Sequence, residues 1–473
     1  MKQKMKIMYK AILLKNSITN VIRELAELKN NLQEDGSLFC YVKNSYNNNQ
    51  IQEDIFDLME YCTSIGLTYI NTIIVPESTE EVYENIQYII WFVKDKNKMY
   101  FNKDAIREKH IWKDVEWGKR TKNYNPKGKD PGNVWIPTLD DGKGKITEHI
   151  LLSESQVYNR IFDATIEKKE DNLFLLSDSE NDIKYKYKNN NITFKYITNN
   201  TDTLKDICLK EKINNDINIK PNAKVVFGTS ENMDKVKNNS VKLIVTSPPY
   251  WDLKNYFKKN QIGQESYEIY SNRMYTVWKQ CYEKLKQDGS MWVNINVRVR
   301  ANQPIYIPKL FIEQCKDIGF IFKGILIWHK SSGIPTNAKN IVDRHEYVLI
   351  FSKSEEDTIK SFKLNKYNDY KNDNLNGGFI WNINRKAGSV GKKTIHPAIY
   401  PTELINRIIK NSTGENDIVL DPFLGSGTSL IAALNNNRKF IGYEFNEGFK
   451  ELMLDRYKKE IIKYDELKIE FID

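Results

Sequence analysis

The chain has 473 residues, of which 40% are hydrophobic and 28% charged, and its formal net charge is +9. This length accommodates two or three domains, and the basic charge favours a polyanionic partner. An apolar run of about 18 residues and a signal-peptide pattern are both lacking, which argues against a membrane or secreted protein and predicts a cytoplasmic location. The five cysteines are scattered without a C-x-x-C pair, so neither a disulfide framework nor a metal site is expected.

An internal repeat organises the chain. Five blocks recur in the same order: residues 32–38 with 285–291, Gly66 with Gly319, 88–94 with 347–353, 134–136 with 380–382, and 159–161 with 406–408. The repeat predicts a duplicated domain, with a first copy at residues 1–180 and a second copy at 222–473. Residues 183–188 and 192–197 alternate with period two, which predicts a hairpin within the linker at 181–221.

The two copies differ where chemistry is expected. Ser247 precedes Asp288 by 41 residues (288 − 247), but only 34 residues precede Asp35. The first copy is therefore expected to begin just after the position of a Ser-Pro-Pro-Tyr turn. Residues 172–177 are matched with 421–427 and lack both glycines, so the first copy is predicted to be non-catalytic.

An insertion at about residues 96–145 of the first copy interleaves glycines, prolines, lysines and aromatic residues. Such a surface suits contacts with phosphates and base edges, although a solvated loop is the plain alternative. The candidate DNA-binding residues are Trp112, Arg120, Lys122, Lys127 and Lys129.

The second copy alternates predicted strands and helices. Strands are expected at residues 224–227, 243–245, 290–296, 321–328, 347–351, 418–420 and 440–443, and helices at 270–285, 401–410, 428–435 and about 446–463. This alternation predicts an α/β fold with a doubly wound, mostly parallel sheet.

A Ser-Pro-Pro-Tyr sequence at residues 247–250 follows the short buried strand at 243–245. Two prolines end a strand because each lacks an N–H and fixes its own φ. The turn offers carbonyl and hydroxyl acceptors beside an aromatic face, which suits a planar ring that carries an NH2 group. A proline turn after a core strand is the alternative.

A glycine-rich segment at residues 421–428 follows a strand and opens a helix, as in nucleotide-binding turns. Glu444 ends the next strand, where an acid accepts hydrogen bonds from ribose hydroxyls. The pattern G-x-x-x-x-G-K-[ST] is missing from the sequence, so a ribose-bearing ligand without a long phosphate tail is favoured.

These motifs resemble the β group of DNA amino-methyltransferases that use S-adenosylmethionine, in residues 246–250, 421–428 and 396–404. The resemblance implies a class I (Rossmann-like) fold, with a target-recognition segment at about 355–393. It implies catalytic roles for Ser247, Pro248, Pro249 and Tyr250, and DNA contacts for Trp251 and Tyr256. The implied cofactor-binding residues are Asp421, Phe423, Gly425, Ser426, Gly427, Thr428, Glu444, Phe445, His396 and Pro397. One departure is residues 227–230, where relatives often carry Gly-Asp; Ser230 or Asn232 is the candidate replacement.

The resemblance further implies transfer of a methyl group to a flipped-out base of double-stranded DNA, as in a restriction–modification system. Cytosine N4 is favoured over adenine N6, and a DNA-binding pseudoenzyme is a further alternative. Protein and RNA methyltransferases are disfavoured by motif order, and a fused nuclease by the absence of a nuclease motif. A cognate restriction endonuclease is a candidate partner. The expected state is a monomer with an internal pseudo-dimer, or a homodimer.

Overall fold

The computed structural model describes residues 7–47, 50–76, 86–108, 127–136, 138–140, 146–149, 151–197, 222–253, 259–300, 303–330, 340–355, 379–384, 400–461 and 469–472. The chain divides into two compact units. The first unit is Met1–Ile197 with Ser290–Ala387, and the second is Thr198–Gly289 with Gly388–Asp473. The domain boundaries expected near residues 180 and 222 stay a prediction.

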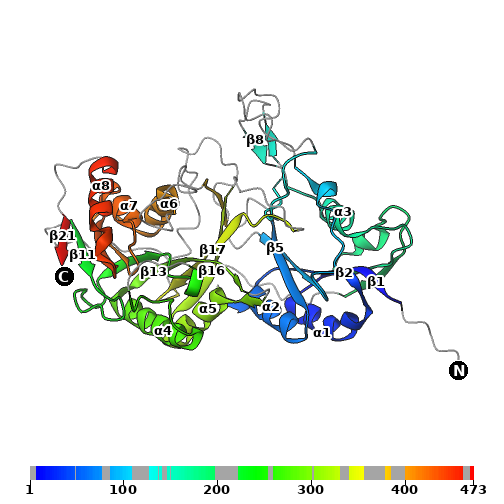
Figure 1. The fold of residues 1–473 in the computed structure, drawn as a ribbon, viewed down its shortest axis with the longest axis horizontal. Helices are drawn as coiled ribbons and strands as arrows, with labels where there is room; N and C mark the ends of the chain where they lie inside the picture. Colours follow the sequence, from blue (N-terminus) through cyan, green and yellow to red (C-terminus); the bar gives the residue numbers. More distant parts are fainter. Residues whose placement is uncertain are drawn as a thin grey trace. The chain divides into compact units, whose positions relative to one another are not determined.

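The first copy is built on a six-stranded sheet in the order β10-β9-β1-β2-β6-β5. Only β6 runs antiparallel to its neighbours. The strands are β1 (Tyr9–Lys15), β2 (Leu32–Val42), β5 (Thr68–Pro76), β6 (Ile86–Val93), β9 (Leu173–Ser177) and β10 (Ile192–Tyr196). The helices are α1 (Ile18–Leu28), α2 (Ile55–Ser64) and α3 (Glu154–Thr165). In the view of Figure 1, α1 and α2 lie below this sheet and α3 above it.

The second copy continues from one unit into the other through β13 (Leu285–Ile295). In the second unit, the strand order is β12-β19-β20-β11-β21, and in the first unit it is β18-β16-β17-β13. The strands of the second unit are β11 (Ala223–Phe227), β12 (Val241–Thr246), β19 (Ile418–Asp421), β20 (Lys439–Glu444) and β21 (Ile469–Ile472), and its helices are α4 (Tyr267–Lys284), α6 (Thr402–Ser412), α7 (Thr428–Asn435) and α8 (Lys450–Glu460). The first unit holds β16 (Ile321–His329), β17 (His345–Ser352), β18 (Ile380–Asn382) and α5 (Ile307–Ile318).

The strands pair in the same register in both copies. Ser37 pairs with Val93 in β2 and β6, and the matching Ser290 pairs with Ser352 in β13 and β17. The next pair, β5 with β6, has an irregularity between Tyr69 and Asn71, and β16 with β17 has one between Phe322 and Gly324. Val134 lies beside Ile74 as Ile380 lies beside Ile327. The doubly wound, mostly parallel fold predicted for both copies is confirmed.

The expected starting point of the first copy is wrong, because β1 is the counterpart of β12. Lys10 of β1 contacts Asp35 at 2.5 Å, and Lys242 of β12 contacts Asp288 at 2.7 Å. Five residues further along each strand, Lys15 therefore stands where the second copy has Ser247. The spacing misled because residues 251–266 separate the Ser-Pro-Pro-Tyr turn from α4, whereas α1 begins at Ile18.

The hairpin expected around residues 183–197 is also wrong. Glu180–Lys184 forms a 3-10 helix, and β10 pairs in parallel with β9. Alternation of lysines with apolar residues identified the strand but not its partner. The match of residues 172–177 with 421–427 is shifted as well, because Leu173 pairs with Ala11 as Val419 pairs with Leu243.

Within the first unit, the first copy packs against residues 290–387 through α2 and α5. These helices are equivalent, since a glycine with positive φ follows the end of each, Gly66 at 85° and Gly319 at 113°. Phe56 of α2 meets Tyr347 of β17 edge to face, with ring centroids 5.3 Å apart. Contact between equivalent elements is the mark of a two-fold arrangement.

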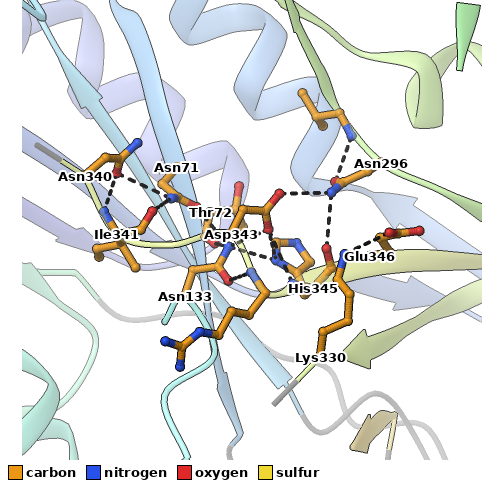
Figure 2. A network of polar contacts seen from close by, with 12 residues as sticks. Asn71, Thr72, Asn133, Asn296, Lys330, Asn340, Ile341, Asp343, His345 and Glu346 are labelled. Carbon is orange, nitrogen blue, oxygen red and sulfur yellow. Dashed lines mark hydrogen bonds and ion pairs between the residues drawn. The ribbon is translucent and has the colours of Figure 1, made fainter. Parts of the chain in front are cut away.

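A polar network joins the same parts of the first unit (Figure 2). The Asn133 side chain is fully buried, and its Nδ2 lies 2.8 Å from His345 Nδ1 and 3.0 Å from Asn71 Oδ1. Its Oδ1 accepts a hydrogen bond from Arg344 N at 2.8 Å. Buried amides need such partners, so this network specifies one docking geometry. Phe379 takes the place of Asn133 in the second copy, since both backbone carbonyls accept from the equivalent strand positions Ile74 and Ile327.

Candidate active site

The predicted catalytic and cofactor motifs begin at the ends of two adjacent strands of the second unit. β12 and β19 are parallel, with Leu243 beside Val419 and Ile244 beside Leu420. At their carboxyl ends, Thr246 Oγ1 donates a hydrogen bond of 2.7 Å to Asp421 Oδ1. Ligands of open α/β sheets bind at this edge. The structure therefore brings together two motifs that lie 175 residues apart in the chain.

The turn at residues 247–250 is partly enclosed. Pro248 and Pro249 are buried, while Ser247 and Tyr250 are half-buried. Tyr270 of α4 donates its hydroxyl to the Pro249 carbonyl at 2.7 Å, in a buried setting. Sequence reasoning missed Tyr270, since nothing in the helical pattern distinguishes it from a core residue.

The chain after the turn is held by a second set of contacts. Trp251 has a positive φ of 50°, and its indole N–H donates to Glu265 O at 2.9 Å. Gly263 has a φ of 101°, and a Cβ there would lie 2.6 Å from Trp251 O, so a side chain is excluded. Arg273 lies 3.6 Å from the Glu265 carboxylate. The predicted DNA contact Trp251 is thus also a structural member of this turn.

Arg273 also contacts Glu231, in the segment that follows β11. Its Nε and Nη2 donate to the Glu231 carboxylate at 3.0 and 2.6 Å, and the hydrogen bond from Arg273 lowers the pKa of Glu231. Ser230 is buried, and Glu231 lies between the two proposed replacements Ser230 and Asn232. An acid is therefore present near this strand end, two positions after Thr229, and it is paired with an arginine.

Asp421 is a buried acceptor for four protein donors. Thr246 Oγ1 and Phe423 N bind Oδ1, while Ser429 Oγ and Tyr400 OH bind Oδ2. Burial raises the pKa of Asp421, and these hydrogen bonds oppose that shift. The carboxylate holds the turn, the glycine loop and Tyr400 in place, and Tyr400 was not foreseen from the sequence.

The glycine loop bends through two residues in the left-handed region, Gly425 at φ 55° and Gly427 at φ 83°. Only glycine adopts this conformation readily. Gly427 is the N-cap of α7, whose bounds match the predicted helix. Ser426 and Thr428 are buried, and Phe423 and Phe445 are half-buried.

Glu444 ends β20 and contacts the glycine loop. Its Oε2 accepts from Gly425 N at 2.7 Å and its Oε1 from Asn446 N at 2.8 Å. Burial raises the pKa of Glu444 to about 7. Each carboxylate oxygen keeps acceptor capacity for a further donor, which suits the vicinal hydroxyls of a ribose. The donor and acceptor set at this edge therefore fits a nucleoside ligand.

Several predicted site residues lie outside the described residues: Trp112, Arg120, Lys122, Tyr256, His396 and Pro397, with nearly all of the 355–393 segment. At the base of the predicted DNA-binding insertion, Lys127 pairs with Asp104 at 2.5 Å. Lys129 lies 4.0 Å from Glu108, and burial lowers its pKa. These two lysines belong to the first unit, and the Ser247 turn belongs to the second.

The described residues contain no cluster of three or more His, Cys, Asp or Glu side chains arranged to hold a metal ion. Among the same residues, none of the helices has the length and apolar character that a membrane crossing requires.

The family model described as DNA methylase, for N6 and N4 methyltransferases, matches residues 13–223 and 241–455. The chain belongs to the N6/N4 DNA methylase family. One matched segment falls in each copy, as the repeat predicts. The methylase uses S-adenosylmethionine as cofactor and modifies exocyclic amines of DNA, and Glu444 and the glycine loop are the residues that fit this cofactor.

The methylase is similar to curated Type II methyltransferases. It is 30% identical to M.Cfr9I of Citrobacter freundii over 264 residues, 48% of this chain and 84% of the relative. It is 30% identical to M.MjaI of Methanocaldococcus jannaschii over 308 residues, 54% of this chain and 98% of the relative.

Solved structures show a weaker likeness. The cytosine-N4-specific PvuII DNA methyltransferase is 22% identical with a TM-score of 0.42, covering 52% of this chain and 92% of that chain. The putative DNA modification methylase TTHA0409 of Thermus thermophilus, complexed with S-adenosylmethionine, is 23% identical with a TM-score of 0.40, covering 53% of this chain and all of that chain.

Proposed function

We propose that the methylase transfers the methyl group of S-adenosylmethionine to N4 of a cytosine in duplex DNA. The observation that carries the proposal is Ser247, half-buried at the carboxyl end of β12 and adjacent to the Thr246–Asp421 hydrogen bond. In the family, Ser-Pro-Pro-Tyr is commoner among cytosine-N4 enzymes and Asp-Pro-Pro-Tyr among adenine-N6 enzymes. Adenine N6 is the alternative target.

The proposed roles of the turn follow from its acceptors. A base inside a duplex cannot reach the site, so the target nucleotide is flipped out and stacks on Tyr250. Ser247 Oγ and the Pro248 carbonyl accept hydrogen bonds from the NH2 group and draw its lone pair out of conjugation. The Pro249 carbonyl already binds Tyr270, which supports the assignment to Pro248. Bound S-adenosylmethionine supplies the methyl group, and the rate comes mainly from positioning of the amine.

The deciding experiment names the modified base. Unmethylated plasmid DNA is incubated with the purified methylase and cofactor carrying a trideuterated methyl group, digested to nucleosides and analysed by mass spectrometry. Labelled N4-methyldeoxycytidine is expected, and Ser247→Ala and Tyr250→Ala are expected to abolish it. Labelled N6-methyldeoxyadenosine would overturn the cytosine assignment, and an absence of label would favour a DNA-binding pseudoenzyme.

We also propose that the first copy contributes DNA contacts through Trp112, Arg120, Lys122, Lys127 and Lys129. Interleaved aromatic and basic residues support this role. Alanine variants of Trp112 and Arg120 are expected to weaken DNA binding with unchanged cofactor affinity, and Arg120→Ala is also expected to flatten its salt dependence. Lys127→Ala tests the residues at the base of the insertion, where the Lys127 ammonium group forms an ion pair with Asp104. Unaltered DNA affinity in all three variants would remove the proposal.

The docking of α2 on α5 supports a monomer whose two copies act as an internal pseudo-dimer. Sedimentation equilibrium is expected to give the mass of one chain, and a mass of two chains would favour the homodimer instead. A cognate restriction endonuclease is a proposed partner, since the two relatives described above are Type II methyltransferases.

A further inference from the structure

Arg456 of α8 reaches the glycine loop from the side of the helix. It is only 6% exposed. Its Nη1 lies 2.9 Å from each of Ser426 O, Ser426 Oγ and Thr428 Oγ1. Its other edge is bound by Glu460, with Nε to Oε1 at 2.9 Å and Nη2 to Oε2 at 3.2 Å. The guanidinium is therefore oriented by one paired carboxylate and directed at the loop.

The loop needs an external support because it is short and bends through the left-handed region at Gly425 and Gly427. Glu444 binds it at Gly425 N, and Arg456 binds it at Ser426 and Thr428. Glu444 lies on β20, and Arg456 lies on the next α-helix, α8. The loop is thus held at its beginning by a carboxylate and at its end by a cation.

We propose that Arg456 is a positioning residue for cofactor binding. It draws the Ser426 carbonyl and the hydroxyls of Ser426 and Thr428 towards α8, which fixes the conformation in which the loop receives S-adenosylmethionine. Arg456 acts through the loop and does not touch the substrate. The inference rests on the cofactor assignment and is independent of the choice between cytosine and adenine.

Two substitutions test the role. Arg456→Gln removes the charge and most of the donors, and Arg456→Lys keeps the charge without the planar fork. Calorimetric titration with S-adenosylmethionine is expected to show affinity weaker by about tenfold or more for Arg456→Gln and an intermediate loss for Arg456→Lys, as expected for lost charge-assisted hydrogen bonds. DNA affinity is expected to stay unchanged, and saturating cofactor is expected to restore most of kcat.

Lys459→Ala is the matched control, because Lys459 lies on the same helix and its side chain is 70% exposed beside Asp455. It is expected to bind the cofactor as the wild type does. Circular dichroism melting curves show whether each variant is folded. Equal cofactor affinity for folded Arg456→Gln and wild type would overturn the proposal.

A double-mutant cycle separates a role through the loop from a general effect. Thr428→Val removes the Oγ1 acceptor, and its effect on cofactor affinity is expected to be smaller in the Arg456→Gln background than in the wild type. Additive effects would show that Arg456 does not act through Thr428 and would contradict the proposal. A wild-type chain without measurable cofactor binding would instead refute the cofactor assignment, which these titrations register separately.

Discussion

Lys15 occupies in the first copy the strand position that Ser247 occupies in the second. The Lys15 side chain is 9% exposed and pairs with Glu154, and its Nζ lies 3.6 Å from Asp178. An ion pair within the first copy therefore fills the place of the predicted amine-binding serine.

The strand pairing also shows which residues of the first copy stand at the positions of Asp421 and Glu444, the two acids of the cofactor site. Phe174 and Leu420 are equivalent, because they pair with the equivalent residues Ile12 and Ile244. The next residue along each strand is Leu175 in the first copy and Asp421 in the second, so Leu175 takes the place of Asp421. Phe194 of β10 pairs with Leu175, and Gly442 of β20 pairs with Asp421, so Phe194 and Gly442 are equivalent. Tyr196 and Glu444 each lie two residues further along their strands, so Tyr196 takes the place of Glu444. Apolar or aromatic residues thus replace both carboxylates, in agreement with a non-catalytic first copy.

The first prediction concerns stoichiometry. Because the first copy lacks counterparts of Asp421 and Glu444, one chain is expected to bind one S-adenosylmethionine. Isothermal titration calorimetry measures the ratio of bound S-adenosylmethionine to active protein chains. Glu444→Ala is expected to weaken the only binding event severely. Two binding events of similar affinity would contradict the prediction.

A second prediction tests the link between the two motifs. Thr246→Val keeps the shape of the side chain but removes the hydroxyl that binds Asp421. Loss of one hydrogen bond to this buried carboxylate is expected to reduce the free energy of unfolding by about 1–3 kcal/mol, because the acceptor loses a donor without access to water. Methyl transfer is expected to slow as well, measured with both substrates saturating.

Thr276→Val is the control for this variant. Thr276 Oγ1 also donates a hydrogen bond, to Asn272 O at 3.1 Å, but the residue is exposed on α4. Its loss is expected to change stability by less than about 0.5 kcal/mol. Similar losses of activity in both threonine variants would show that the Asp421 link has no special role.

A third prediction concerns Tyr270. Tyr270→Phe removes the donor to the Pro249 carbonyl in a buried setting, and loosens the turn that carries Tyr250. A fall in kcat with little change in cofactor affinity is expected, together with a loss of about 1–2 kcal/mol in stability. Tyr185→Phe, whose hydroxyl binds Asn159 at an exposed position of the first copy, is expected to leave kcat unchanged.

A fourth prediction follows from the raised pKa of Glu444. Burial raises this pKa from 4.5 to about 7, so between these values the folded chain holds a proton that the unfolded chain has released. The free energy of unfolding of the cofactor-free protein is therefore expected to fall as pH rises from 4.5 to 7. The ionised carboxylate is the form that accepts from ribose hydroxyls, so cofactor affinity is expected to rise with pH through about 7.

Glu444→Gln separates these two effects. The amide does not titrate, so both pH dependences are expected to flatten in this variant. At about pH 8, above the raised pKa, it is expected to melt at a higher temperature than the wild type when no cofactor is present, and to bind S-adenosylmethionine more weakly. Unchanged pH profiles in Glu444→Gln would show that another group titrates.

Local patterns in the sequence predicted most of the framework. The glycines at 36 and 289 allow close contact with the neighbouring strand, where a Cβ would lie 2.8 Å from Lys10 O and 3.0 Å from Lys242 O. Such positions keep their residue type when the rest of a copy changes, so the repeat was visible. The start of the first copy could not be located in the same way. Counting residues back from Asp35 assumes loops of equal length in the two copies, but residues 251–266 of the second copy have no counterpart before α1.

The supporting residues of the site could not be predicted for a different reason. Tyr270, Tyr400 and Arg456 meet their partners across 21 to 30 residues of sequence, on elements whose packing the local pattern does not specify. The motifs themselves were visible, since prolines and glycines mark strand ends and turns directly.

The contacts of Asn133 with Arg344 and His345 belong to a single polypeptide. Separate subunits dissociate when their concentration falls below the dissociation constant, whereas tethered partners meet at an effective concentration set by the linker. The specific activity of this methylase per chain should therefore not decline on dilution.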